Sequence, residues 1–436
     1  MGRTYEIRDP IHGFVTLNDW ERDIINHPVF QRLRRIRQLS LTDMVYPGAM
    51  HTRFEHSLGV MQVATRMFDH ICEKRRDFLT SELHFNDDGL GRDRVLVRLS
   101  CLLHDVGHAP FSHAAEGLMD KNTQTGKAYK HEHYSAAAVY FLMQDVIENH
   151  PINQNYHIKA KEIADFLNGE SKVGRSILWR SLVSSQLDAD RADYLLRDSH
   201  HIGVAYGHYD INRLIVTITM AIDHETSSAV LAVEEGGEHA AEALIIARYM
   251  MFTQVYFQHT RRAYDYHSVE AIRYLLSEHQ RENRNNNKNV FPPPTSKEYV
   301  EDYLKWDDWR VLGLISQGKA GEHGQILLGR THNRAIYETP EIPSPEDHEF
   351  AKEIQVSLGD DVGFVDCASS SWYKFKSADV PLLLRPGQSD EKLTPLSTRS
   401  SVVNGLKAVE RTRIYVPMDT DFHYQLIWYP FHDTVA

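Results

Sequence analysis

The chain has 436 residues, of which 42% are hydrophobic and 25% charged, and its formal net charge is −12. This length suits one large domain or a domain with appendages, and such an acidic surface does not favour broad binding to nucleic-acid phosphates. No apolar run reaches the roughly 18 residues of a membrane span, no apolar signal segment opens the chain, and only three cysteines occur. We therefore expect a cytoplasmic protein without a membrane partner.

Apolar residues at helical spacing dominate the first part of the chain. The spacing from Phe54 to Ile71 predicts an amphipathic helix over about 54–75. A second apolar run, 95–103, predicts a helix that ends near Gly107 and Pro110, because these residue types punctuate helices. Further helices are predicted over 132–148, 159–168, 187–198, 238–278 and 298–317.

The composition changes after residue 280. The stretch 281–296 is rich in asparagine and proline and is predicted to be a linker or exposed loop. Beyond it we expect short strands and loops, with strands over 325–328, 354–358 and 413–416 and loops over 339–347 and 385–400. The sequence thus predicts a mainly α protein, with a helical core over 1–280 and a smaller mixed α/β region over 297–436.

One histidine–aspartate pair has a promising setting. His104-Asp105 closes an apolar helix just before a glycine–proline break, where side chains can project into a cleft. Metals such as manganese, iron and zinc accept imidazole and carboxylate ligands together. His56 and Asp190 are candidates to complete such a site, although, taken alone, each is explained more readily by a helix cap or a solvated acidic face. The second pair, His432-Asp433, is interpreted as an exposed polar pair.

Several motifs follow one another in a recognisable order. They are DPIHG at 9–13, FQRLRRIRQL at 30–39, RFEHSLG at 53–59, HDVGHAPFSH at 104–113 and the acidic segment 188–198. Together they strongly resemble the HD-domain deoxynucleoside triphosphate triphosphohydrolases over about residues 5–275. The resemblance implies an HD-domain helical core and hydrolysis of a dNTP to a deoxynucleoside and inorganic triphosphate. Because the HD motifs start almost at once, we expect a bacterial type without a sterile-alpha-motif domain.

The resemblance also implies a divalent metal, whose identity among manganese, iron, magnesium and zinc stays open. The implied ligands are His56, His104, Asp105 and Asp190. The implied general acid is His113, oriented by Glu116, with His108 and His131 near the α-phosphate. If Pro110 opens a new helix, His113 and Glu116 share one face at i, i+3 spacing.

The substrate positions implied by the family fall into three groups. Arginines suited to forked bonds with a triphosphate stand at Arg53, Arg191 and Arg248. Arg191 replaces a lysine of some relatives, which keeps the charge and changes the geometry. Aromatic residues lining the nucleotide site are Tyr194 and Tyr256. Residues that would recognise the 3′-hydroxyl and crowd out a 2′-hydroxyl are Gln38, Leu39 and Asp198.

The family further implies homo-oligomers, often tetramers, with an activator nucleotide bound between subunits. The matching arginines are Arg32, Arg34, Arg35 and Arg37, which a solvated helix face explains as well. Asn26 stands where the family reads guanine with an aspartate, so that pairing would be lost or altered.

Two other functions stay open at this point. An HD phosphohydrolase could act on a nucleoside monophosphate, a cyclic nucleotide or a signalling nucleotide instead. A nucleotide-sensing or nucleic-acid-binding module with little turnover is the other alternative. The intact predicted ligands argue against an inactive module, and the net charge of −12 argues against a dedicated DNA-binding protein.

Overall fold

The computed structural model describes residues 3–169, 178–223, 226, 228–282, 289–370, 379–388 and 390–420. The fold is mainly α-helical, with small sheets that are concentrated in the C-terminal region. The predicted polar pair His432-Asp433 and part of the predicted linker, 283–288, lie outside the described residues. Along the helices that the structure describes, none combines the length and apolarity needed to cross a membrane.

The first half of the chain forms the helical core after a short hairpin. The hairpin pairs β1 (Tyr5–Asp9) with β2 (Gly13–Leu17) in antiparallel register. The helices that follow are α1 (Asp19–Asn26), α2 (Pro28–Gln31), α3 (Arg53–Lys74), α4 (Arg76–Ser81), α5 (Asp87–Leu103), α6 (His131–Leu142), α7 (Gln144–Glu148), α8 (Ala160–Asn168), α10 (Ala189–Ile202) and α11 (Ile211–Thr217). Short 3₁₀ segments span Arg32–Arg35, Thr42–Met44, Ser112–Leu118 and Pro151–Asn155.

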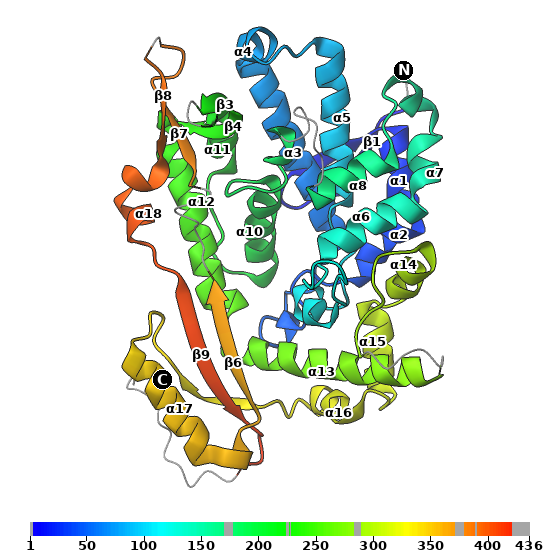
Figure 1. Cartoon of the computed structure of the whole chain (residues 1–436), viewed down its shortest axis with the longest axis vertical. Coiled ribbons are helices and arrows are strands. Elements are labelled where there is room, and N and C mark those ends of the chain that lie inside the picture. Colours follow the sequence, from blue (N-terminus) through cyan, green and yellow to red (C-terminus); the bar gives the residue numbers. More distant parts are fainter. Residues whose placement is uncertain are drawn as a thin grey trace.

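Helix α3 lies at the centre of this core and packs against both α5 and α10 (Figure 1). The Glu55 carboxylate accepts from the backbone N–H of Thr52 at 2.9 Å, which satisfies a donor that the helix start leaves unpaired. The approach to α10 requires Gly59, because an added Cβ there would lie 1.9 Å from Oδ1 of Asp193. The same approach places the first turns of α3 and α10 side by side.

Longer helices and two small sheets complete the chain. The helices are α12 (Glu238–Met251), a π-helical turn (Phe252–Tyr256), α13 (His259–Glu282), α14 (Lys297–Leu304), α15 (Asp308–Ser316), α16 (Gly321–Gly329), α17 (Pro345–Leu358) and α18 (Ser401–Gly405). One sheet has the order β3 (Ile218–Asp223), β4 (Ser228–Glu234), β7 (Pro381–Leu384), β8 (Lys392–Pro395). The other has the order β5 (Arg334–Glu338), β9 (Val409–Val416), β6 (Phe364–Ser370). In Figure 1, α13 crosses the lower part of the molecule, and β6 and β9 run past one of its ends.

Most of the predicted helices are confirmed, although some that were predicted as continuous are divided into shorter helices. Met143 separates α6 from α7, and residues 257–258 separate the π-helical turn from α13. The strand at 413–416 is confirmed within β9, while the strands predicted at 325–328 and 354–358 are wrong, because these residues lie in α16 and α17. Short apolar runs do not distinguish a strand from one face of a helix. The predicted loop 385–400 contains β8, and the hairpins β1–β2 and β3–β4 were not predicted.

One described residue of the predicted linker, Phe291, packs into the protein. Phe291 is fully buried, and its backbone N–H donates to the carbonyl of Leu118 at 2.8 Å. It belongs to a second apolar cluster with Tyr303 and Trp306, beside the main core. Whether 1–280 and 297–436 are separate domains stays a prediction.

Candidate metal centre and substrate pocket

The four predicted metal ligands come together from three helix ends. His56 lies in the first turn of α3, Asp190 lies in the first turn of α10, and His104-Asp105 directly follows α5. Nε2 of His56 lies 3.0 Å from Oδ1 of Asp190 and 3.7 Å from Oδ2 of Asp105. Nε2 of His104 lies 3.3 Å from Oδ1 of Asp105 and 3.8 Å from Oδ1 of Asp190. Three of the four, His56, His104 and Asp190, offer ligand atoms close enough together to hold a metal ion.

The two imidazoles are oriented by contacts on their other nitrogen. Nδ1 of His104 donates to the backbone carbonyl of Cys101 at 2.7 Å, and Nδ1 of His56 lies 2.7 Å from Oδ2 of Asp193. With Nδ1 of each ring held in this way, each Nε2 faces the carboxylates and would be the nitrogen that ligates a metal. Metal-ligating histidines are typically held in this way by a carbonyl or carboxylate. Two imidazole nitrogens with two carboxylates also form a donor set that fits manganese, iron or zinc.

Asp193 is itself held by residues from the N-terminal hairpin and from α10. Nε2 of His12 lies 2.6 Å from its Oδ1, and Arg197 donates to both of its oxygens at 2.8 and 2.9 Å. Arg197 also donates to Asp9 at 2.9 Å. Burial opposes ionisation of Asp193, but Arg197 outweighs it and holds the pKa of Asp193 well below its usual range. The carboxylate therefore stays available to orient His56.

Negative charge dominates the ligand cluster. Burial opposes protonation of His56, but the carboxylates of Asp190 and Asp193 outweigh it and raise the pKa of His56 to about 10. Burial likewise opposes ionisation of Asp105, but Arg53, His104 and His108 lower the pKa of Asp105 well below its usual range. A cluster that holds positive charge this strongly is suited to a divalent cation.

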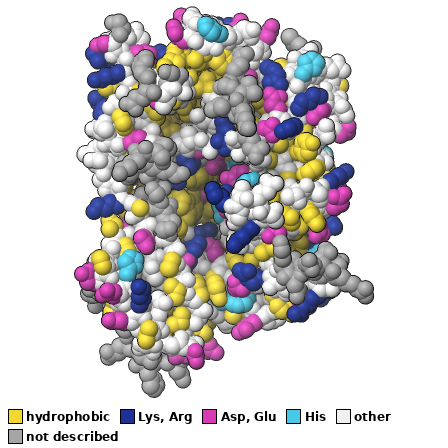
Figure 2. Space-filling view, in the orientation of Figure 1, with side chains coloured by type: hydrophobic (Ala, Val, Ile, Leu, Met, Phe, Trp, Pro, Cys, Tyr) yellow, Lys and Arg dark blue, Asp and Glu magenta, His cyan; other side chains and the backbone are white. Residues whose placement is uncertain are grey.

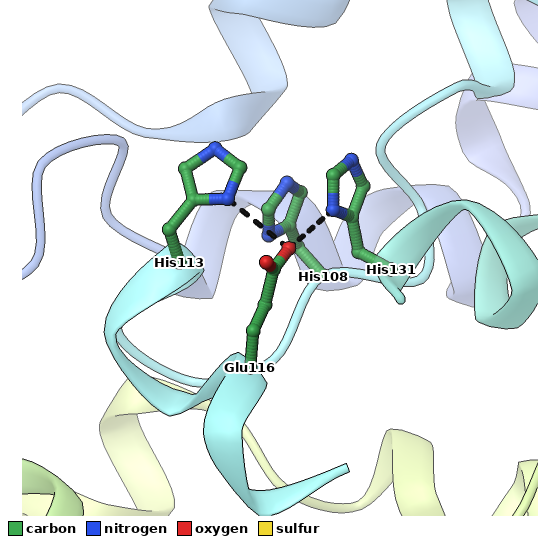
Figure 3. A group of neighbouring side chains, drawn as sticks. All are labelled: His108, His113, Glu116 and His131. Atoms are coloured by element: carbon green, nitrogen blue, oxygen red, sulfur yellow. Dashed lines mark hydrogen bonds and ion pairs between the residues drawn. The ribbon is translucent and has the colours of Figure 1, made fainter. Parts of the chain in front are cut away.

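The predicted catalytic residues form a second cluster beside the first (Figure 3). Glu116 points between two imidazoles: its Oε1 lies 3.1 Å from Nδ1 of His113 and is also hydrogen-bonded to Nδ1 of His131. The rings of His108 and His131 stack with centroids 3.9 Å apart. Nε2 of His108 lies 3.3 Å from Oδ1 of Asp105, which joins this cluster to the metal ligands.

The electrostatics of this second cluster favour an ionised Glu116 beside a protonated His131. Burial opposes ionisation of Glu116, but hydrogen bonds with His113 and His131 outweigh it and lower the pKa of Glu116. Burial favours neutral His131, but Glu116 outweighs it and raises the pKa of His131. Burial, together with Arg53 and His131, lowers the pKa of His108 well below its usual range, so His108 is neutral. An ionised Glu116 therefore faces the protonated imidazole of His131, and a carboxylate beside a protonated imidazole is a typical arrangement for proton transfer.

The turn that carries His113 differs from the prediction. The 3₁₀ segment begins at Ser112 rather than at Pro110, yet His113 and Glu116 still lie on one face as expected from their spacing. Arg53, buried at the start of α3, donates from Nε to Oγ of Ser112 at 2.9 Å and also pairs with Asp105. Arg53 therefore connects the two clusters.

A cavity of about 640 Å³ opens next to these residues. Six of the predicted substrate residues and the predicted acid line it, namely Gln38, Leu39, Arg53, His113, Tyr194, Asp198 and Tyr256. Figure 2 shows a hollow near the middle of one face, where basic, acidic and histidine side chains gather. Arg191 and Arg248 are not among the described lining residues, but both interact electrostatically with Asp190. They therefore flank the metal ligands from α10 and α12.

Asp198 is fixed from two sides at the cavity wall. Its Oδ1 lies 2.8 Å from Nε2 of the buried His51, and its Oδ2 accepts from the hydroxyl of Tyr256 at 2.6 Å. The ring of His201 stacks on His51 with centroids 4.5 Å apart. The sequence interpretation assigned no role to His51, and no signal in the linear sequence marks it as a partner of Asp198.

The far wall of the cavity comes from the C-terminal region. Phe364 of β6 stacks on Tyr266 of α13 with ring centroids 3.9 Å apart. Asp366 of β6 accepts a forked pair of hydrogen bonds from Arg262, with the Nε contact at 3.0 Å. Strand β6, which the sequence interpretation had not predicted, therefore closes the cavity opposite the helices that carry the metal ligands.

All four arginines expected to form an activator site make contacts within the chain. Arg32 is buried and donates to the backbone carbonyls of Leu304 and His108 at 3.0 and 2.9 Å. Arg35 pairs with Asp307 at 2.5 Å, and Arg37 pairs with Asp43 at 2.6 Å. The guanidinium of Arg34 lies over the ring of Phe54. Arg32 is thus part of the core.

A buried histidine–aspartate cluster on a helical core defines the class of HD-domain phosphohydrolases. The chain matches the HD domain over residues 53–198 and the HD associated region over residues 209–288. The chain belongs to the HD-domain family.

The chain is also similar to three other proteins. The uncharacterized protein YwfO of Bacillus subtilis is 30% identical, over 94% of this chain and 92% of its own length. The deoxynucleoside triphosphate triphosphohydrolase SAMHD1 of Homo sapiens is 33% identical over 48% of this chain, which spans only 35% of that protein. The crystal structure of a hypothetical protein from Aquifex aeolicus superposes with a TM-score of 0.74 and 26% identity, over 95% of this chain and 97% of the other.

Proposed function

We propose that the protein hydrolyses deoxynucleoside triphosphates to a deoxynucleoside and inorganic triphosphate. The observation that supports this most strongly is the cavity that Arg53 and His113 line together with Asp198 and Tyr256. A bound dNTP would use each of these groups if its triphosphate contacts Arg53 and His113 and its deoxyribose contacts Asp198 and Tyr256. The similarity to SAMHD1, whose name states this activity, points the same way.

In this proposal His56, His104, Asp105 and Asp190 hold a divalent metal. Such an ion acts as a Lewis acid on a phosphoryl oxygen and makes water a better nucleophile near neutral pH. Arg53 binds the phosphates together with Arg191 and Arg248, whose charges lie beside Asp190. Arginine suits this role because its planar guanidinium forms forked bonds with phosphate oxygens.

His113 would donate the proton to the departing 5′-oxygen. Its side chain is 64% exposed and lines the cavity, so a substrate can reach it, whereas His131 is only 15% exposed. Glu116 holds the imidazole through Nδ1 and leaves Nε2 free to face the substrate. His108 and His131 complete the polar surroundings of the reacting phosphate.

Selection of deoxyribose would rest on Gln38, Leu39 and Asp198. The Asp198 carboxylate is fixed by His51 and Tyr256 and can accept a hydrogen bond from a 3′-hydroxyl. A site that encloses the sugar this tightly rejects an additional hydroxyl through steric conflict and unpaired polar groups. We further propose that the chain forms a homo-oligomer, with a tetramer favoured by the family. An activator nucleotide between subunits would have to bind without Arg32, which is buried.

Separate incubation of the metal-replete protein with each dNTP, NTP and dNMP tests the proposal. Chromatography of the products should show a deoxynucleoside and intact triphosphate from dNTPs. Pyrophosphate or orthophosphate as the first product would contradict triphosphate release. Turnover of dNMPs alone would instead support an HD phosphohydrolase on another nucleotide.

A further inference from the structure

The carboxylate of Asp308, at the start of α15, joins two segments that border the cavity. Its Oδ1 accepts from the backbone N–H of Phe111 at 2.8 Å, and its Oδ2 accepts from the backbone N–H of Arg37 at 2.8 Å. The Asp308 side chain is only 1% exposed. These segments are far apart in the sequence, and α15 lies beyond the residues that match the family models.

The segment that contains Phe111 has an unusual backbone. Phe111 and Ser112 have φ angles of 57° and 59°, in the left-handed region that residues other than glycine seldom adopt. Two such residues in succession persist only where the surrounding structure holds them. The Phe111 ring is fully buried, and the contact with Asp308 satisfies its backbone N–H. Asp308 is therefore one of the groups that hold this turn.

The turn ends at the residues that face the cavity. Oγ of Ser112 accepts from Nε of Arg53 at 2.9 Å and donates to the carbonyl of Arg37 at 2.5 Å. His113 is the next residue, and its imidazole reaches Glu116. The two segments that Asp308 joins are thus also connected through Ser112, one residue before the proposed acid.

We propose that Asp308 is a positioning residue for the reaction. Its carboxylate fixes the Phe111–Ser112 turn against Arg37 and thereby sets the places of Ser112, Arg53 and His113. This inference rests on the proposed function of His113 as proton donor. Asp308 does not line the cavity, so it acts without touching the substrate.

Asp308→Asn is the central variant, because it keeps the size of the side chain and replaces one acceptor oxygen by an NH₂ group that cannot accept from a backbone N–H. Asp307→Asn is the matched control. Asp307 caps the same helix through the N–H of Arg310 at 2.9 Å and pairs with Arg35 at 2.5 Å, so its loss disturbs α15 without removing the contact to the turn.

Steady-state kinetics with the best dNTP separates positioning from general stability. Displacement of a catalytic group by about 1 Å costs about 100-fold in rate, so Asp308→Asn should lower kcat by about 10- to 100-fold and leave KM within about threefold. Metal content should stay at the wild-type level. Asp307→Asn should keep kcat within about threefold of wild type even where it lowers the melting temperature.

Ser112→Ala tests the same turn without altering the buried carboxylate. If Asp308 acts through this turn, the double variant Asp308→Asn/Ser112→Ala should be no slower than the slower single variant. Additive losses, wild-type kcat in Asp308→Asn, or an equal loss in Asp307→Asn would each overturn the proposal. If Asp308→Asn folds poorly, Ser112→Ala becomes the test. An unchanged kcat in Ser112→Ala would then overturn the proposal.

Hydrogen exchange of the backbone amides provides a readout that needs no substrate. The backbone amides of Phe111 and Arg37 should exchange faster in Asp308→Asn than in wild type. In Asp307→Asn their exchange rates should equal those of wild type. If wild-type protein hydrolyses no dNTP, the proposed function fails, while this exchange pattern still decides whether Asp308 holds the turn. Unchanged exchange in Asp308→Asn would refute the positioning role independently of any activity.

Discussion

The carboxylate of Asp193 lies 2.7 Å from Nδ1 of His56, on the side of the imidazole that faces away from the metal ligands. Asp190, the proposed ligand, lies one helical turn earlier on α10 and faces the opposite nitrogen at 3.0 Å. One helix therefore supplies both a ligand and the group that orients another ligand. The predicted metal affinity depends on Asp193 as well as on the four ligands.

Asp193→Asn should weaken metal binding by about 10- to 100-fold, because groups that orient ligating histidines typically contribute that much. Competition with a chelator of known affinity measures the change. Asp210→Asn, at the exposed start of α11, is the control and should bind metal normally. Wild-type affinity in Asp193→Asn, with an intact fold, would contradict the orienting role.

His113→Ala should lower kcat by about 100- to 10,000-fold, the usual contribution of a general acid, and leave metal content and dNTP affinity nearly unchanged. Glu116→Gln should lower kcat in the same direction. Because Glu116 contacts both His113 and His131, the double variant should be slower than His113→Ala alone.

His133→Ala provides a control from the same histidine-rich segment. Nδ1 of His133 accepts from the backbone N–H of Lys130 at 3.0 Å and takes no part in the Glu116 cluster. Its kcat should therefore stay close to wild type. A collapse of metal content in His113→Ala would show instead that His113 supports the ligand site.

Asp198→Ala should reduce the preference for dNTP over NTP by at least about tenfold in kcat/KM, because discrimination by a polar site depends on the partner it offers the sugar hydroxyl. Tyr256→Phe and His51→Ala, which remove one support each, should reduce it less. His200→Ala, on the exposed face of the same helix, should not change it. Equal turnover of dNTP and NTP by wild-type protein would remove this prediction altogether.

The stability of the fold should depend on pH through Asp308. Burial raises the pKa of Asp308 to about 7 in the folded chain, against 3.8 for a free aspartate. The folded state thus binds this proton more tightly, so the stability that Asp308 contributes is greatest below about pH 4 and is lost as the pH rises to about 7. Asp308→Asn removes the titration.

The wild-type advantage in unfolding free energy over Asp308→Asn should therefore fall by about 2 to 3 kcal/mol between pH 5 and pH 8. Urea denaturation of both proteins at several pH values measures this difference, in which the titrations common to both cancel. A difference that does not change with pH would contradict the buried titration.

The proposed metal ligands could be predicted from the sequence, but the residues that orient them could not. His56, His104-Asp105 and Asp190 lie in motifs with their own helical context, so their clustering followed from the family pattern. Asp193 lies at i, i+3 from Asp190, yet its contact with His56 exists only because Gly59 lets α3 and α10 approach closely. Such contacts depend on packing between helices, which spacing along one helix does not determine.

Two different causes explain what the sequence did not predict correctly in the C-terminal region. The apolar runs at 325–328 and 354–358 are faces of α16 and α17. Ser344 followed by Pro345 is a typical signal for the start of a helix, and α17 begins there. Asp308 carried no signal at all, since its two partners, Arg37 and Phe111, belong to remote segments. Long-range contacts of this kind follow only from the assembled fold.

Strand β6 supplies part of the cavity wall from a different region of the chain than the proposed reacting residues. The proposed metal ligands and the proposed proton donor lie in the first half, whereas Phe364 and Asp366, which line the same cavity, come from the far end of the chain. Substitutions confined to β6 can change the shape of the cavity while the proposed metal ligands and proton donor stay the same. Relatives that share the HD motifs but differ in β6 are therefore expected to diverge first in which molecules they accept, and only later in what they do to them.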